Sequence, residues 1–183
     1  MRTVSPDRVP TDVREATERS RRLSLRYFNL FRLLLAGLFV VAGREFGLGN
    51  EAPLVFNVIS IGYLAAVLAL GFPDAQRRFG VDRVIALQAI IDILALSVIM
   101  WASGGYRSGM PVLMMVILAG AGLVAEGRMV LFFASIATLA VLVENAWRLA
   151  VGGHSVDFLQ VGIFCTGFFG IALVARLLAL RAQ

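Results

Sequence analysis

Long uninterrupted apolar stretches constrain the fold of this chain more than any other feature. Six of them lie at about residues 27–46, 54–72, 84–102, 110–125, 129–149 and 158–179. A bilayer core of ~30 Å is crossed by ~20 residues of α-helix, so all but the fourth stretch are long enough to span it. The fourth begins near Pro111 and is expected to pack among its neighbours or to sit where the bilayer is thin. We therefore predict an all-α polytopic membrane protein, a bundle of six transmembrane helices joined by short loops.

The composition agrees with this fold class and argues against several functions. Hydrophobic residues make up 59% of the chain and charged residues 16%, whereas soluble domains have roughly half and roughly a quarter. The net charge of +5 comes from arginines at span ends and in the N-terminal tail, without interleaved aromatic residues, so nucleic acid is not expected as a partner. With one cysteine, Cys165, and one histidine, His154, neither a disulfide nor a zinc site is expected. No phosphate-binding loop and no Ser/His/Asp set is visible, so we expect no catalytic centre and no cofactor.

The arginines also predict the orientation of the bundle. With the N-terminus inside, the cytoplasmic segments carry thirteen arginines and the outer segments only Arg44, Arg107 and Arg148. Because positive residues are retained on the cytoplasmic side, both termini are expected there. The predicted divisions are a basic tail at 1–26, the membrane domain at 27–179 and the start of a cytoplasmic linker at 180–183. In the tail, Asp12 and Glu15 have the spacing of a capping box and predict a short amphipathic helix along the membrane surface. The alternative is a solvated charged tail.

Three polar residues fall at similar depth in the first and third apolar stretches. Asp92 lies near the middle of the third stretch with Gln88 one turn away, and Arg32 lies about as deep in the first. A charge at the bilayer centre costs ~2.5 kcal/mol or more. We therefore expect either an ion pair between Arg32 and Asp92 across two helices, or a protonated Asp92 bonded to Gln88. Two interpretations stay open: this contact only holds helices together, or a change in its protonation or pairing shifts their packing.

A further charged group lies near the outer end of the fifth stretch. Glu144 is followed one turn later by Arg148, a spacing that favours an ion pair at the interface. The alternative is that Glu144, together with Asn57 of the second stretch, contacts a polar partner in the outer leaflet. Small residues permit close helix approach within the bundle, in a dimer or against a foreign helix. The candidate packing positions are Gly120, Gly122, Gly162, Gly167 and Gly170.

An ordered set of short motifs runs along nearly the whole chain. They are the Tyr-x-x-x-x-Arg-Leu pattern of Tyr27–Leu33, Phe56-Asn57, Phe72-Pro73, Asp92-Ile93-Leu94, the Gly-Gly-x-x-Ser-Gly loop of Gly104–Gly109, Gly127-Arg128, Glu144 and Gln160-Val161-Gly162. In this order and spacing they resemble the membrane-embedded sensor region of PilS-type histidine kinases, the sensors of type IV pilus two-component systems.

The resemblance implies a dimeric sensor in the bacterial inner membrane. In that family a six-span region precedes a cytoplasmic PAS domain, a dimerisation helix with the phospho-accepting histidine, and an ATP-binding domain. The kinase phosphorylates a response regulator, and the membrane region is expected to detect the transmembrane helix of pilin. The chain stops at Gln183, so we expect a sensor fragment without the modules that bind ATP, Mg²⁺ and the response regulator. The rival hypothesis is a small-molecule-binding subunit of a membrane transporter, which has a similar size and number of spans.

Overall fold

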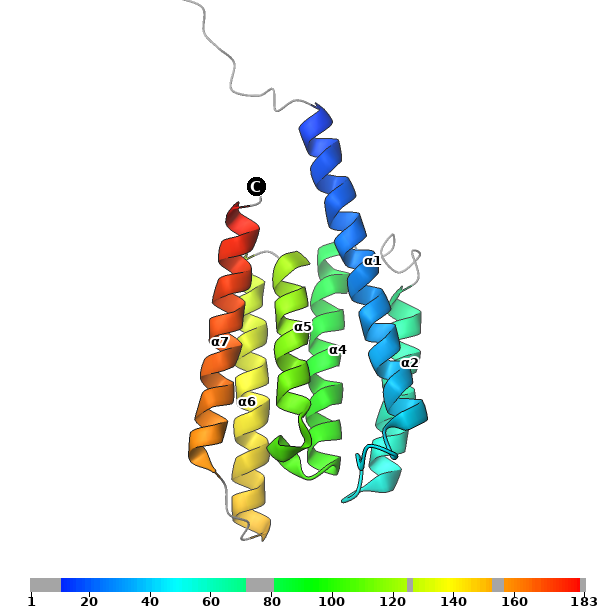
Figure 1. Ribbon diagram of the computed structural model, residues 1–183, viewed down its shortest axis with the longest axis vertical. Helices are drawn as coiled ribbons and strands as arrows, with labels where there is room; N and C mark the ends of the chain where they lie inside the picture. Colours follow the sequence, from blue (N-terminus) through cyan, green and yellow to red (C-terminus); the bar gives the residue numbers. More distant parts are fainter. Residues whose placement is uncertain (1–10, 72–80, 125–126, 153–156, 182–183) are drawn as a thin grey trace, which may run out of the picture.

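The computed structural model describes residues 11–71, 81–124, 127–152 and 157–181, and all regular structure in these ranges is helical. This confirms the predicted all-α fold class. Figure 1 shows the helices side by side, mostly along one direction. In chain order they are α1 (Thr11–Ala42), α2 (Pro53–Gly71), α4 (Val81–Ala102), the 3-10 helix η1 (Gly105–Ser108), α5 (Met110–Val124), α6 (Gly127–Gly152) and α7 (Phe158–Arg181).

Four of the helices, α2, α4, α6 and α7, are long and apolar enough to cross a membrane, with mean hydropathies of 2.1, 2.3, 1.9 and 2.0. α5 carries a shorter apolar segment, Met110–Gly122, as predicted for the fourth stretch. The bounds of α2 and α4 to α7 follow the predicted stretches closely, because glycine, proline and charged residues separate these stretches in the sequence.

α1 differs from its prediction at both ends. It runs without a break from Thr11 to Ala42, and its first turns extend beyond the other helices (Figure 1). The expected short helix and the first apolar stretch form one continuous helix, because neither proline nor glycine interrupts residues 11–36. At its other end α1 stops before residue 46, and the chain turns through Gly47 and Gly49, whose φ angles are 72° and 75°. His154 and the side chains of the expected capping box lie outside the described part of the chain.

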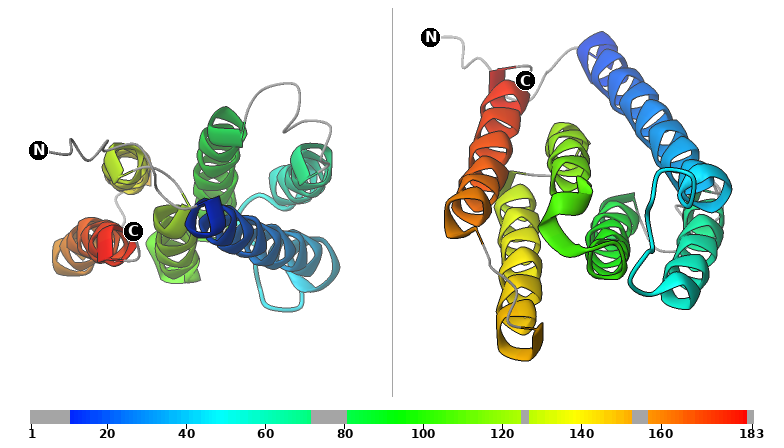
Figure 2. Two further views of the ribbon diagram at one scale, coloured as in Figure 1. Left: turned by 90° about the horizontal axis from the view of Figure 1, so that it is seen from above. Right: turned by 60° about the horizontal axis from the view of Figure 1, so that its bottom comes forward.

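α4 is the central helix of the bundle. It packs against α2, α5 and α6, whereas α7 packs against α5 and α6, and α1 packs against α2 and, less extensively, α5 (Figure 2). Of the apolar segment of α4, 56% is buried, compared with 22% for α2 and for α7. Gln88 and Asp92 of α4 are buried at 2% and 0% exposure, the setting in which polar groups are tolerated inside a membrane.

Three of the five candidate packing glycines lie at helix contacts inside the bundle. Gly120 of α5 lies under the ring of Phe28 of α1, and Gly122 lies against Ala175 of α7, so an added Cβ would collide at either position. Gly167 of α7 is covered in the same way by a methionine of α5. These residues allow α5 to approach both α1 and α7 closely.

The other two candidate glycines face away from the bundle. Gly162 and Gly170 of α7 are exposed, and a Cβ added to either would meet no atom within 4 Å. Thr166, exposed and midway between them, bonds back to the carbonyl of Gly162 at 2.8 Å. Gly162, Thr166 and Gly170 thus form an exposed stripe on α7.

Candidate functional site

A buried ion pair connects α1 to α4. Arg32 donates to Asp92 Oδ1 through Nη2 at 2.6 Å and through Nε at 2.9 Å, and both side chains have 0% exposure. Arg32 Nη2 also lies 3.4 Å from the backbone carbonyl of Gln88, and the guanidinium lies 5.8 Å from the ring centre of Phe28. Each charge therefore has a counter-charge at a depth where an unpaired charge would be costly.

Gln88 connects α2 to this contact. Its side-chain amide donates to the backbone carbonyl of Leu70 at 3.0 Å, which is one of the carbonyls that the last turn of α2 leaves without a helical partner. Gln88 thus does not bond to the Asp92 side chain, and the ion pair with Arg32, not a bond between Asp92 and Gln88, is the arrangement in the structure.

Tyr63 belongs to the same cluster and was missed by the sequence reasoning. It lies on α2 with 2% exposure, and its hydroxyl interacts electrostatically with Asp92 and Arg32. Even so, Tyr63 Oη, Asp92 Oδ2 and Arg32 Nη1 lack a partner with hydrogen-bond geometry among the described residues. The buried polar cluster of Arg32, Tyr63, Gln88 and Asp92 is therefore incompletely satisfied. In the sequence Tyr63 resembles an ordinary aromatic core residue, because it shares a helix face with Phe56 and Val67.

A second polar cluster, the outer cluster of Glu51, Glu144 and Arg148, joins α6 to the turn between α1 and α2. Arg148 donates to Glu51 at 3.0 and 2.8 Å, to the backbone carbonyl of Trp101 at 2.8 Å, and to Glu144 Oε1 in the predicted i, i+4 pair. Two carboxylates share one guanidinium, so the cluster has a formal charge of −1. Glu144 Oε2 is buried and has no hydrogen-bond partner among the described residues.

Gly105 of η1 makes room for the outer cluster. It is buried, with a φ of 84°, and a Cβ at this position would lie 2.7 Å from Arg148 Nε and 2.9 Å from Glu144 Oε1. Glycine satisfies both the backbone conformation and the close approach. The second glycine of the Gly-Gly loop therefore leaves room for the ion pair of Glu144 and Arg148.

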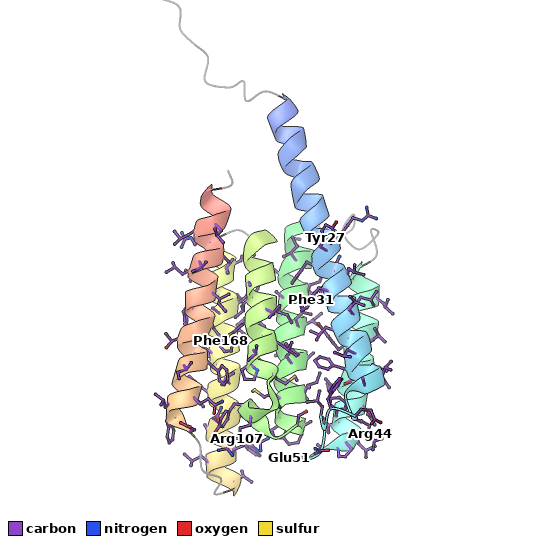
Figure 3. The ribbon with its side chains drawn as sticks, viewed as in Figure 1. Tyr27, Phe31, Arg44, Glu51, Arg107 and Phe168 are labelled. Carbon is purple, nitrogen blue, oxygen red and sulfur yellow. The ribbon has the colours of Figure 1, made fainter. Side chains whose placement is uncertain are left out.

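Charged residues from different segments gather at this end of the bundle. Figure 3 shows Arg44, Glu51 and Arg107 at one end and Tyr27 toward the other. The arginines predicted for the outer face therefore share one end of the helices, together with Arg148, which bonds to Glu51.

The structure does not bring Asn57 and Glu144 together. Asn57 is half-buried on α2 and forms no hydrogen bond within the described residues. Glu51, which lies 97 residues from Arg148 in sequence, occupies the place that was expected for Asn57. A single exposed glutamate in a turn has no sequence pattern that would have identified it.

The described residues form two grooves on the sides of the bundle. The first, of about 390 Å³, runs between the C-terminal halves of α4 and α6. It is lined by Ser97, Val98, Trp101, Ala140, Val143, Glu144 and Trp147. The second, of about 340 Å³, lies between α1 and α2 and includes Arg26, Asn29 and Leu68. Among the described residues no group of three or more His, Cys, Asp or Glu is placed to hold a metal ion. The described residues offer helix contacts and hydrogen-bonding groups in these grooves.

Comparison with known proteins places the bundle in a family. A model of the PilS-like transmembrane domain matches residues 14–183. The sensor protein kinase PilS of Pseudomonas aeruginosa is 29% identical over 179 residues, which cover 93% of this chain and 33% of that protein. The chain thus spans about a third of the length of this relative. No solved structure matches significantly. Because the family model covers almost the whole chain, including every helix from α2 to α7, this protein belongs to the family of PilS-like transmembrane domains.

Proposed function

We propose that this multi-pass membrane domain is the input domain of a two-component sensor histidine kinase and relays its signal through α7 to a kinase module. On this proposal the domain lies in the bacterial inner membrane with both termini in the cytoplasm. The similarity to a sensor kinase supports the sensor role, and the arginine distribution supports the orientation. ATP, Mg²⁺ and the response regulator would be bound by the kinase module, and the bundle itself would need no cofactor.

One observation carries the proposal: the buried polar cluster joins three helices and leaves polar atoms unsatisfied. A buried ion pair adds little net stability over a well-packed apolar contact, so its presence calls for another advantage. Because Arg32, Tyr63 and Asp92 have spare donors and acceptors, a shift of α1 or α2 can exchange partners within the cluster. Such an exchange provides the two helix arrangements that a ligand must distinguish in order to signal. The same direct pairing argues against the transporter hypothesis, since these polar groups bond to each other and not around a substrate.

We infer that the detected ligand is the transmembrane helix of a pilin subunit and that it docks in the groove between α4 and α6. The groove has small residues, Ser97 and Ala140, toward its inner end, where a helix can approach closely. Toward the outer end, Glu144 lines the groove and has an oxygen without a partner. A hydrogen-bond donor on the incoming helix would satisfy this oxygen when the carboxylate turns toward the groove.

We further infer that the protein is a homodimer that pairs through the exposed stripe of α7. Gly162, Thr166 and Gly170 are spaced four residues apart on one exposed face, the spacing with which small residues bring membrane helices together. α7 is also the helix that leads to the C-terminus, so a rotation of two paired α7 helices would be transmitted directly to a following kinase dimer.

Co-purification with a tagged pilin transmembrane segment tests the ligand. We expect Glu144→Gln to lower recovery of the segment about threefold, which corresponds to ~0.6 kcal/mol for one interhelical hydrogen bond. Ala140→Phe, which fills the groove, should lower it further. Glu45→Gln is the matched control, because Glu45 is an exposed carboxylate in the turn after α1. Recovery that is the same in all variants would contradict the docking site, and a small molecule retained by the purified protein would favour the transporter instead.

A further inference from the structure

The groove between α1 and α2 has the layout of a binding site for an amphiphile. Arg26 lies at one end, level with Gly71, the last residue of α2. Leu33 and Val67 line the groove about two and one helical turns deeper along α1 and α2. Its volume of about 340 Å³ lies within the range of small-molecule sites, ~300–1,000 Å³. A polar headgroup at the Arg26 end and an acyl chain along the leucines would match this distribution.

The charge at the polar end favours an anionic group. Arg26 is exposed and forms no ion pair among the described residues, in contrast to Arg32 and Arg148, which are both paired. A guanidinium binds phosphate oxygens through two parallel hydrogen bonds. Basic pockets between membrane helices are a recurrent place for acidic lipid headgroups.

Asn29 adds a second requirement for the headgroup, a hydrogen-bond donor. It lines the groove one turn from Arg26, and its Oδ1 is buried without a hydrogen-bond partner in the described part of the chain. A buried acceptor left unsatisfied costs ~1–3 kcal/mol, so a ligand that donates to this oxygen when the amide turns into the groove would be favoured. The headgroup therefore needs an anionic phosphate for Arg26 and a hydroxyl for Asn29.

From these features we propose that the groove between α1 and α2 binds a phospholipid with an anionic, hydroxyl-bearing headgroup, of the phosphatidylglycerol type. A lipid, not a free phosphate ion, is the expected occupant because Leu30 and Leu68, at 52% and 46% exposure, line the groove next to the polar end. Such a ligand is already present in a bilayer.

The position of the groove gives the lipid a consequence for the bundle. Leu33 lies directly after Arg32, and Leu70, whose carbonyl accepts from Gln88, directly precedes Gly71. A lipid in the groove therefore holds together the two helices that contribute Arg32 and Tyr63 to the buried polar cluster. The site does not depend on which partner the domain detects.

Native mass spectrometry of the purified protein with added lipid tests the proposal. Phosphatidylglycerol, phosphatidylmethanol and phosphatidylcholine are compared at equal concentration. Phosphatidylmethanol has the same phosphodiester charge without the headgroup hydroxyls, and phosphatidylcholine has neither a net charge nor a hydroxyl. We expect retention in the order phosphatidylglycerol, phosphatidylmethanol, phosphatidylcholine.

Variants assign the binding to the groove. Arg26→Gln should lower phosphatidylglycerol affinity about fivefold, which is what ~1 kcal/mol per basic residue near an anionic headgroup amounts to. Asn29→Leu should lower it to the level of phosphatidylmethanol. Arg44→Gln, an exposed arginine at the other end of the bundle, is the control and should have no effect.

A further variant tests the groove by its shape and leaves its charge unchanged. A Cβ at Gly71 would meet no atom within 4 Å, so Gly71→Leu should fill part of the groove without disturbing the fold and should prevent retention. Equal retention of the three lipids, equal effects of Arg26→Gln and Arg44→Gln, or full binding by Gly71→Leu would each overturn the proposal.

Discussion

Removing one partner of the buried ion pair should destabilise the bundle far more than removing both. Arg32 and Asp92 are each 0% exposed and bond at 2.6 and 2.9 Å. Arg32→Met leaves Asp92 buried without its counter-charge, and Asp92→Leu does the same to Arg32. Loss of one partner of a buried pair typically costs ~3–5 kcal/mol. A loss of 3 kcal/mol corresponds to a folding equilibrium constant lowered more than a hundredfold.

The double variant, Arg32→Met with Asp92→Leu, should behave differently. Replacing a whole buried pair by apolar residues of similar volume is often neutral or stabilising by ~1–4 kcal/mol. We therefore expect the double variant to unfold at or above the wild-type free energy. With each single variant costing at least ~3 kcal/mol, the coupling energy between the two sites is then at least ~6 kcal/mol. The three variants form a complete double-mutant cycle.

Unfolding in mixed micelles, with helix content followed by circular dichroism, measures these free energies. Arg44→Met is the control, because Arg44 is exposed and should change stability by no more than ~0.5 kcal/mol. Single variants that each cost less than ~1 kcal/mol, or a double variant no more stable than the worse single variant, would refute the view that the two charges are retained only as a pair.

Two further predictions concern glycines and use matched controls. Gly105→Ala should lower the unfolding free energy by ~1–2 kcal/mol for the left-handed backbone, and further because the new Cβ displaces the Arg148 contacts. Gly109→Ala, with a φ of 80° and no neighbour within 4 Å, should lower it only by the backbone contribution. The difference between the thermal unfolding midpoints of the two variants measures the effect of the clash at Gly105. Gly122→Leu should lower the unfolding free energy by ~1–3 kcal/mol because it overpacks the contact between α5 and α7. Gly170→Leu should leave that free energy unchanged and weaken dimerisation instead, as measured by energy transfer between labelled copies in vesicles; a dimer unaffected by it would contradict pairing through α7.

The helices could be predicted from the sequence because the bilayer imposes their length. Each spanning segment must satisfy its backbone hydrogen bonds internally and present ~20 apolar residues to lipid, so span positions follow from hydropathy alone. This is why the bounds of α2 and α4 to α7 agree with the predicted stretches. The same rule says little about the polar part of α1, which lies outside the lipid, and there the predicted surface helix differed from the continuous helix of the structure.

The sequence also indicated that charges buried in the bundle would have partners, because an unpaired charge inside a bilayer is costly. The ion pair of Arg32 with Asp92 was one of the two arrangements predicted from their similar depth, and the pair of Glu144 with Arg148 was one of the two interpretations of their helical spacing. Their surroundings were decided only by the tertiary structure. Tyr63 and Glu51 come from other segments, and nothing local in the sequence distinguishes them from a core tyrosine or a solvated loop glutamate.

The roles of the small residues were decided entirely by the packing of the helices. Gly120, Gly122 and Gly167 face neighbouring helices, whereas Gly162 and Gly170 face outward. In a membrane helix the lipid-facing and protein-facing sides can both be apolar, because lipid tails are as apolar as the leucine side chains of a neighbouring helix. Hydropathy therefore determines that a segment spans the membrane, but the direction in which each side of the helix points depends on how neighbouring helices fit together.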